Sequence, residues 1–566
     1  YRETDQVLVL GTDSRGVFIY RPKHFTNFIY HNQKAPLVNT YYAQCMLDPN
    51  TLLASNGLLI DPVTNTVKGK FEKGFNPYLL CKADEDHVYF MQGPHIYLYC
   101  ISTGEARQLN LREEFGTHFI DKIDGHIWLG TTVGIGILHE DTVQWVHRTP
   151  LREDIYGIQC ISPDEEGNIW FGSYFQLYRL NQKTNHLDSF PSLANADIRI
   201  LKILRGNLYI GTNGSGYYIY HQGRFFHMPA GRKNELSHTH NFIDDAQGFL
   251  WIPTNHGLFK THLDAIDGFL QDTTNTLDYY VYQQEDGIRS TEFNGGCSPP
   301  HLWLPDGRLS LPTIEGLAMF RPGDTPHFFT KDSILIESIE VDGTQLKPGQ
   351  ELTIPPDHTS IRIYFAGAWW SNPSNQYVYF KLEGFHEQFR LGNVNQASFT
   401  VGHLKPGNYT FVLKRRIGFG PMDYIYSRQY LTVLKPWYLK TWAYLLYAFG
   451  FFMTVWATSV VYTRSIRKRN IELQKKVDEQ TAKLLSSNIQ LEDNLKKLAA
   501  SELNLRKNIR VRDRLISIIT HDILTPLRFI GQIARLGSEE KPEDPGMAKR
   551  ALIDVKNATY KLFHST

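Results

Sequence analysis

Short runs in which apolar and polar residues alternate fill the first 320 positions of the chain, and turns rich in Gly, Asn and Asp separate them. Such alternation is the pattern of a half-buried β-strand. One motif recurs: a hydrophilic turn, a strand, a small residue, a second turn and a second strand. Its copies are VLVLGTDSRGVFIY from Val7, TLLASNGLLID from Thr51, HVYFMQGPHIYLY from His87, GHIWLGTTVGIGIL from Gly125, GNIWFGSYFQLYRL from Gly167, GNLYIGTNGSGYYIY from Gly206, GFLWIPTNHGLFK from Gly248 and GRLSLPTIEGLAMF from Gly307.

Most of these eight copies lie about 40 residues apart, which leaves room for two further strands in each repeat. That period is typical of the four-stranded blades of a β-propeller. A single blade cannot bury both of its faces, so blades stack around a common axis. We predict an all-β propeller over residues 1–325 with seven blades, the first copy being left over from a preceding propeller. Eight blades is the alternative.

A different series of strands follows the repeats. Six or seven alternating runs in about 105 residues favour a β-sandwich of immunoglobulin-like size, which we place at residues 326–436. Trp369 and Trp370 lie in this region. They could form an exposed platform for a ligand, but packing at a strand edge is the preferred interpretation.

Residues 441–463 contain no charged side chain, and a helix of that length crosses a hydrocarbon core about 30 Å thick. Four basic residues follow directly: Arg464, Arg467, Lys468 and Arg469. Because basic flanks stay in the cytoplasm, they orient the span. We predict one transmembrane helix over 437–463 in the inner membrane, with residues 1–440 periplasmic and 464–566 cytoplasmic.

A long helical pattern follows the apolar run. Its seam alternates in steps of four and three, as in a coiled coil: Val477, Thr481, Leu484, Asn488, Leu491, Leu495 and Leu498. The seam breaks at Glu502 and resumes in another phase at Leu505, and such a phase change marks a place where helix packing can switch. We predict a coiled-coil signalling linker over residues 464–510; a passive spacer is the alternative.

A histidine stands at the centre of the last apolar helical stretch, Ser517 to Ile530, which reads SIITHDILTPLRFI. Asp522 follows His521 at once, and Thr525 and Pro526 begin three residues after the acid. Apolar residues recur around it at helical steps: Ile516, Ile519, Ile523, Leu527 and Ile530. His521 lies about 200° round the helix from Ile519. We therefore expect a solvent-facing, neutral imidazole that can act as a nucleophile.

Three stretches resemble parts of two-component sensors. Thr520 to Leu527 resembles the H-box of sensor histidine kinases, H-[D/E]-x-x-[T/S/N]-P. The repeats GHIWLGT and GNIWFG resemble the periplasmic regulator propellers of such sensors. Tyr377-Val-Tyr379-x-x-Leu-x-Gly384, followed by Leu404-x-Pro-Gly-x-Tyr409, resembles the triple-tyrosine domain that follows those propellers. Together they resemble a hybrid two-component-like histidine kinase truncated before its ATP-binding domain.

The resemblance implies a role for each residue of the box. His521 accepts the phosphoryl group, and Asp522 orients the ring and takes the released proton. Thr525 positions water for dephosphorylation of the partner regulator, and Pro526 bends the helix. Leu524 departs from the family pattern, because many members carry Lys or Arg there.

The resemblance also implies partners and cofactors. Residues 511–566 would form an incomplete α-helical hairpin, and two copies would pair as a dimeric four-helix bundle in a homodimer. A cognate response regulator and an extracellular ligand, of oligosaccharide class in related proteins, are the other expected partners. ATP and Mg²⁺ would be bound by a domain that this chain lacks, since NATYKLF from Asn557 falls on the second hairpin helix.

Composition limits the other classes of function. The net charge of +1 and the 21% of charged residues give no single-sign field, so nucleic acid is not an expected partner. The five cysteines lack zinc-site spacing, and turns such as DEEGN from Asp164 lack the ligand count of a calcium loop, so no metal site is predicted. Trp128, Trp170 and Trp251 share one slot of the repeat, which indicates blade packing and not sugar stacking.

Two other functions remain as alternatives. The chain could be a membrane-anchored glycan-binding receptor whose hairpin dimerises without phosphotransfer. A propeller glycosidase would need paired carboxylates on one face, whereas Asp and Glu lie mostly in turns here. We expect the chain to be a fragment at both ends, because it begins inside a strand-like run and stops inside a helical one.

Overall fold

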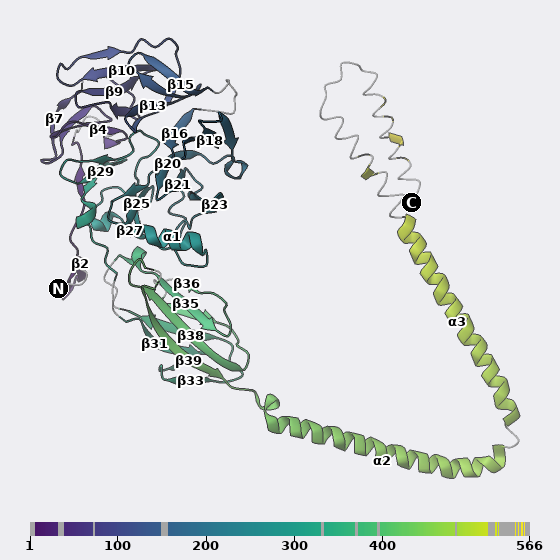
Figure 1. Ribbon diagram of the computed structural model, residues 1–566. Coiled ribbons are helices and arrows are strands. Elements are labelled where there is room, and N and C mark those ends of the chain that lie inside the picture. Colours follow the sequence, from purple (N-terminus) through teal and green to yellow (C-terminus); the bar gives the residue numbers. More distant parts are fainter. Residues whose placement is uncertain are drawn as a thin grey trace. The chain divides into compact units, whose positions relative to one another are not determined.

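The structure is a computed structural model with two compact units, Tyr1–Trp437 and Tyr438–Thr566, each described by itself (Figure 1). It describes residues 6–31, 39–71, 74–148, 157–329, 333–367, 372–392, 397–420, 422–480 and 484–518, and eight isolated positions from Leu527 to Tyr560.

The described part of the first unit contains seven consecutive four-stranded antiparallel sheets, the blades of the propeller. Blades 1 to 3 are β4–β7 (Gln44–Asp48, Thr51–Ala54, Leu58–Asp61, Thr66–Lys70), β8–β11 (Leu80–Lys82, His87–Gln92, His95–Cys100, Ala106–Gln108) and β12–β15 (Thr117–Ile123, His126–Thr131, Gly134–His139, Thr142–Arg148). Blades 4 and 5 are β16–β19 (Ile158–Pro163, Asn168–Ser173, Leu177–Asn181, His186–Ser189) and β20–β23 (Ile198–Leu204, Asn207–Thr212, Tyr217–His221, Arg224–His227). Blade 6 is β24–β27 (Ile243–Asp244, Phe249–Thr254, Gly257–His262, Tyr280–Tyr282), with helix α1 (Leu263–Gln271) inserted before its last strand.

The seventh blade closes the ring with a strand from the start of the chain. Strands β28 (Leu302–Trp303), β29 (Leu309–Thr313) and β30 (Gly316–Phe320) are completed by β3 (Thr26–Phe28), which pairs with β30 in antiparallel register. The prediction of seven blades is therefore confirmed. The first motif copy, β1 (Leu8–Thr12) and β2 (Gly16–Tyr20), is a separate two-stranded hairpin.

The small residue in the middle of each motif has a packing role. Gly130, Gly172 and Gly211 occupy the same slot, and a Cβ atom added to them would lie 2.5 or 2.6 Å from Ile158 or Ile198 of the following blade or from Ile200 of the same blade. Only glycine permits this close approach of the inner strands.

A carboxylate organises the turn that precedes two of the tryptophans. Asp245 accepts hydrogen bonds from the backbone N–H groups of Gln247 and Phe249 and, at 2.9 Å, from Nε1 of Trp251. Asp164 makes the equivalent bonds at the DEEGN turn and also accepts from Nε1 of Trp170 at 2.9 Å. These side chains thus form the turns as predicted.

The tryptophans of the repeat slot are buried. Trp128, Trp170 and Trp251 are 5%, 3% and 0% exposed, so each contributes its ring to the packing of a blade. This confirms that the slot serves packing and not a surface platform.

A two-sheet sandwich follows the propeller in the chain. One sheet has the order β32-β31-β34-β37 and the other β33-β39-β38-β35-β36, around a core that includes Ile339, Phe365, Phe411 and Leu413. The strands are β31 (Leu335–Val341), β32 (Thr344–Leu346), β33 (Glu351–Ile354), β34 (Ile361–Ala366), β35 (Val378–Glu383), β36 (Arg390–Leu391), β37 (Ser398–Val401), β38 (Gly407–Arg416) and β39 (Tyr424–Val433). The predicted sandwich is confirmed, while Trp369 and Trp370 lie outside the described residues.

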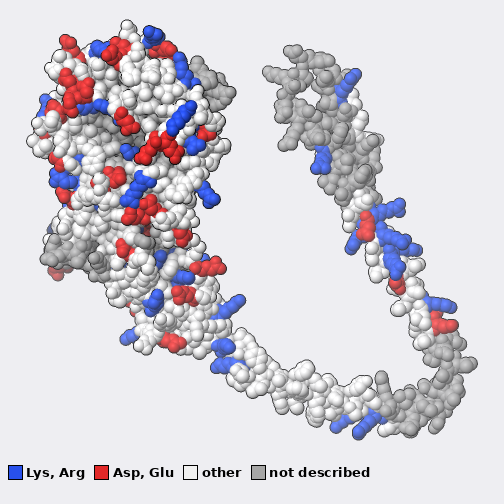
Figure 2. Space-filling view, in the orientation of Figure 1, with Lys and Arg blue, Asp and Glu red and all other residues white. Residues whose placement is uncertain are grey.

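The described part of the second unit includes two long helices, α2 (Thr441–Gln480) and α3 (Leu484–Ile518). The first 28 residues of α2, Thr441–Lys468, are long and apolar enough to cross a membrane. Figure 2 shows an uncharged surface over this part of the chain, with basic side chains toward each end. In the sequence, Lys435 and Lys440 precede the apolar run, and Arg464, Arg467 and Lys468 follow it.

We expect Asp245→Ala to lower the free energy of unfolding of the propeller by about 2–4 kcal/mol, because it leaves a buried indole N–H and two backbone N–H groups without an acceptor. Urea denaturation followed by tryptophan fluorescence measures the change. Asp61→Ala is the matched control, since Asp61 caps a more exposed turn through Val63 and Thr64 and bonds no tryptophan. Equal losses in the two variants would contradict the role of the buried indole.

Candidate functional site

The predicted phosphoacceptor residues His521, Asp522, Thr525 and Pro526 all lie outside the described residues. Helix α3 is described as far as Ile518, just before His521. The structure therefore describes a continuous helix of 35 residues that precedes the H-box in the chain. The roles of the four residues remain predictions from the sequence.

The predicted seam of α3 is an exposed apolar stripe. Leu491, Leu495 and Leu498 are 63%, 63% and 73% exposed. Two ion pairs with i,i+4 spacing lie along the same helix: Asp493 with Lys497 and Glu502 with Arg506, each at 3.1 Å. Such pairs stabilise a solvent-exposed face, whereas exposed leucines at heptad spacing fit the contact face of another helix.

The apolar part of α2 satisfies its polar groups internally. The hydroxyls of Thr454 and Thr458 donate to backbone carbonyls within the same helix, at 2.7 to 2.9 Å. Large apolar side chains such as Phe449, Phe452 and Trp456 are more than 60% exposed. A helix that pairs its own hydrogen-bonding groups and presents apolar side chains outward suits a bilayer, where no water is available.

The propeller holds a cavity of about 320 Å³ along the inner strands β12, β16 and β20. The segment Cys297–His301 forms part of its wall, and Ser298 fixes that segment by donating to the carbonyl of Ile120 at 2.6 Å. Asp121, Arg199 and Lys202 are the charged residues of the cavity's inner strands. The cavity is thus a polar space with charges of both signs.

Burial sets the protonation of two groups in this cavity. Burial raises the pKa of Asp121 to about 6, and the positive charge of Lys202 only partly offsets this increase. Burial lowers the pKa of His301 to about 4, and Nδ1 of that ring lies 2.8 Å from the side-chain amide nitrogen of Asn241. His301 is therefore neutral at pH 7, and its Nδ1 accepts a hydrogen bond from the Asn241 amide. Asp121 exchanges its proton near pH 6.

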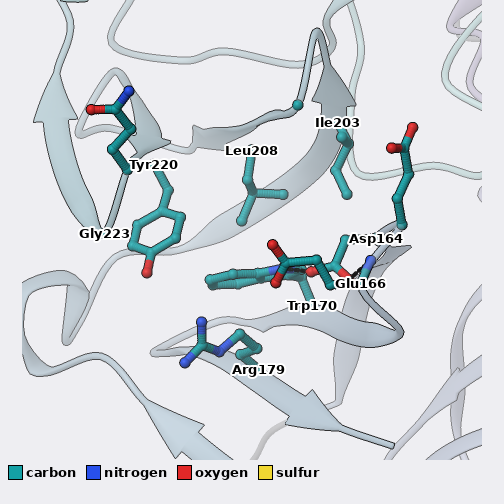
Figure 3. Close-up of a pocket in the computed structure, with 11 residues that line it drawn as sticks. Asp164, Glu166, Trp170, Arg179, Ile203, Leu208, Tyr220 and Gly223 are labelled. Carbon is teal, nitrogen blue, oxygen red and sulfur yellow. Dashed lines mark hydrogen bonds between the residues drawn. The ribbon is translucent and has the colours of Figure 1, made fainter.

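A second cavity, of about 310 Å³, lies between blades 4 and 5 (Figure 3). Trp170 stacks on Phe190, with ring centroids 5.4 Å apart, and the Arg179 guanidinium lies 5.3 Å from the indole centroid. Arg179 also pairs with Asp188 at 2.7 Å. The aromatic wall is engaged in packing, so this pocket offers a ligand mainly its polar rim, where Glu165 and Glu166 lie.

One group of potential metal ligands lies on blade 2 of the described chain. Ligand atoms of Asp86, His87 and Cys100 come within 4.8 Å of one another. Asp86 accepts from the backbone and hydroxyl of Ser102, each at 2.7 Å, and His87 bonds Asp84 at 2.9 Å. Sequence spacing does not reveal this group, because His87 and Cys100 are far apart in the chain and the β9–β10 register places them opposite each other.

No family model matches the chain. A curated relative, the histidine kinase P4 of Formosa agariphila, is 23% identical over 398 residues, which cover 62% of this chain and 27% of the relative. The extracellular domain of the hybrid two-component system BT3049 from B. thetaiotaomicron has a TM-score of 0.52 at 17% identity, with 77% of this chain and 61% of that chain covered. The extracellular domain of the hybrid system BT4673 has a TM-score of 0.40 at 15% identity, over 76% and 61% of the two chains.

The match to BT3049 shows the propeller-and-sandwich fold, and the relative that is named a histidine kinase supports a sensor kinase. The resemblance to two-component sensors is confirmed at this level. The chain spans about a quarter of the length of that relative, so activity, ligand and partners are matters of proposal.

We expect Asp121→Asn to stabilise the propeller at pH 7.5 by about 1–3 kcal/mol and to change little at pH 4. The folded carboxyl has its pKa near 6 against an ordinary 3.8, so the folded protein binds more protons in that range. Stability from this group is present below pH 3.8 and is lost as the pH rises to 6. Urea midpoints from pH 4 to 7.5 test this, with Asp124→Asn on the exposed turn as control; a pH-independent difference would contradict it.

Proposed function

We propose that the chain is the sensing, membrane-spanning and phosphoacceptor portion of a transmembrane histidine kinase in a two-component phosphorelay. One observation carries the proposal. The sandwich leads through β39 into the apolar helix α2, and α3, described as far as Ile518, precedes the sequence HDILTP at His521 in the chain. Sensor, span and candidate phosphoacceptor thus follow one another in a single chain.

The four residues of the H-box fit phosphoryl transfer from ATP to a histidine. A ring nitrogen of His521 attacks the γ-phosphorus of ATP, the new N–P bond forms, and ADP leaves. Asp522 would accept the ring proton, and Mg²⁺ held with the nucleotide by the ATP-binding domain would neutralise phosphate charge. The phosphoryl group then passes to an aspartate of the response regulator, and Thr525 positions the water that later removes it. Pro526 would remove one helical hydrogen bond and bend the helix there.

The exposed stripe of α3 supports a homodimer. A single helix that leaves Leu491, Leu495 and Leu498 more than 60% exposed would gain by pairing with the same stripe of a second copy. Dimerisation would also complete the four-helix bundle that the H-box hairpin requires.

We place the first unit in the periplasm and α2 in the inner membrane. The basic residues after Thr463 support the orientation, because positive flanks remain cytoplasmic. An extracellular ligand of oligosaccharide class is proposed from the resemblance to regulator propellers, and the cavities of the propeller offer polar groups that could bind hydroxyls.

We expect His521→Ala to abolish phosphoryl incorporation when the chain is joined to the ATP-binding domain of a hybrid two-component kinase and given γ-labelled ATP. The loss should exceed 100-fold, because the acceptor nitrogen is gone. The label should be lost in acid and kept in alkali, as expected for phosphohistidine. His564→Ala is the matched control and should keep full labelling. Undiminished labelling of His521→Ala would show that another residue accepts the phosphoryl group and would contradict the proposal. Absence of label on the unaltered chain would favour a glycan-binding receptor without phosphotransfer.

We expect Leu498→Cys to form an intermolecular disulfide in oxidised membranes, since this position lies on the predicted contact seam. Lys496→Cys lies two positions away on the outer face and should cross-link at least several-fold more slowly. Non-reducing electrophoresis of the intact protein measures both rates. Equal cross-linking of the two variants would argue against a paired seam at this point.

A further inference from the structure

Blade 6 carries a rigid insertion that the other blades lack in the described chain. The hairpin β22–β23 of blade 5 turns within two residues, whereas β26 and β27 are separated by α1 and a loop. Arg205 of blade 5 holds α1 through Asp264 at 2.6 Å and Asp267 at 2.8 Å. Leu263 and Ile266 of α1 are buried in the core beneath it. The insertion ends at Asp278, just before β27 begins at Tyr280.

The sandwich docks on this insertion through two tyrosines of the triple-tyrosine motif. The Tyr377 hydroxyl donates to the backbone carbonyl of Tyr279 at 2.8 Å, and the Tyr379 hydroxyl donates to the Asp278 carboxylate. The rings of Tyr377 and Tyr379 are 6% and 7% exposed, so both hydroxyls are shielded from bulk water. In the interior each such bond fixes the two partners more firmly than at a surface.

A side-chain amide extends the blade's hydrogen bonding into the sandwich unit. Asn375, just before β35, accepts from the backbone N–H of Val281 at 2.6 Å and donates to its carbonyl at 2.8 Å. Beside it, Arg232 of the propeller donates to the carbonyl of Gln376 and lies 3.9 Å from the ring centroid of Tyr377. Both residues thus tie the entry to β35 onto the propeller.

A buried ion pair lies at the centre of the contact. Arg416 of β38 is 3.2 Å from Asp278, and both side chains are 4% exposed. Burial lowers the pKa of Arg416 to about 10, which leaves it charged at neutral pH. Phe329 and Phe419 lie 5.4 and 5.0 Å from the guanidinium and exclude water. Separation of the domains would expose this desolvated pair and break the hydroxyl bonds together.

The ion pair also lies at one end of a long hairpin. Strands β38 and β39 pair over ten residues, from Arg416 opposite Tyr424 to Gly407 opposite Val433. A hairpin of that length spans about 30 Å. The clamp thus holds one end of β39, and the other end continues through residues 434–440 into the membrane helix α2.

We propose that Asp278, Tyr377, Tyr379 and Arg416 lock the propeller and the sandwich into one rigid body, whose movement reaches the membrane helix through β39. The four are positioning residues for signalling. The rigidity of the contact between propeller and sandwich does not depend on phosphotransfer, whereas its consequence for signalling rests on the proposed function. A ligand on the propeller would then shift the sandwich as a whole, and would not open a hinge between them.

Pulsed electron–electron double resonance on the intact protein in lipid nanodiscs tests whether the propeller and the sandwich form one rigid body. Spin labels at Val63→Cys on the propeller and Leu335→Cys on the sandwich occupy exposed positions, 66% and 61% accessible, in a Cys100→Ser background. We expect one narrow distance distribution in the otherwise unaltered protein. Tyr377→Phe/Tyr379→Phe, which removes only the two hydroxyls, should broaden it at least two-fold. Tyr426→Phe, on the exposed face of β39, should leave it unchanged.

Calorimetry of the same proteins gives a second, independent readout. The propeller and sandwich should unfold in one transition, and Arg416→Met should split that transition into two. An unchanged far-ultraviolet circular dichroism spectrum of the variant would show that both domains still fold. A broad distribution before mutation, or a narrow one in the double tyrosine variant, would overturn the proposal. Neither readout depends on labelling of His521, so failure of the kinase proposal would be seen separately.

Discussion

The pairing of β3 with β30 is the constraint on which the fold of the first unit depends. A blade buries its faces only against its two neighbours, so an open ring would leave two blades with an uncovered face. Closure by a strand that precedes blade 1 ties Asn27 to Ala318, almost 300 residues away, and fixes every blade between them. It also fixes the inner strands, whose polar residues line the central cavity, and the insertion of blade 6, on which the sandwich docks.

Local features of the sequence were sufficient to predict the architecture. The glycine slot of the repeat marks where inner strands approach closely, and the tryptophan slot marks where blades pack, so both signals repeat with the blade. The uncharged run after Thr441 is equally local, because hydrophobic length alone decides whether a helix can span a bilayer. The seven-blade ring, the sandwich and the candidate span could therefore be predicted before any contact was known.

Contacts between distant residues could not be predicted in this way. The longer gap before the last repeat is visible in the sequence, but nothing local shows that it holds α1 or that Asp278 meets Arg416. Asp121 likewise stands at an ordinary polar position of an alternating strand, and only the closed ring turns that position toward a desolvated cavity. For the H-box the sequence pattern is the whole basis, since His521 and its neighbours lie outside the described residues.

The burial of four of the five cysteines determines how they respond to oxidants. Cys45, Cys81, Cys160 and Cys297 are buried, and burial raises the pKa of each thiol, to about 12 for Cys45 and Cys297. Because the thiolate is the species that reacts with oxidants and disulfides, these four are chemically inert while the ring stays closed. Cys100 is the partly accessible thiol. Oxidation of the other four thiols would therefore require local unfolding of the propeller, and its extent would measure how often a blade unfolds locally.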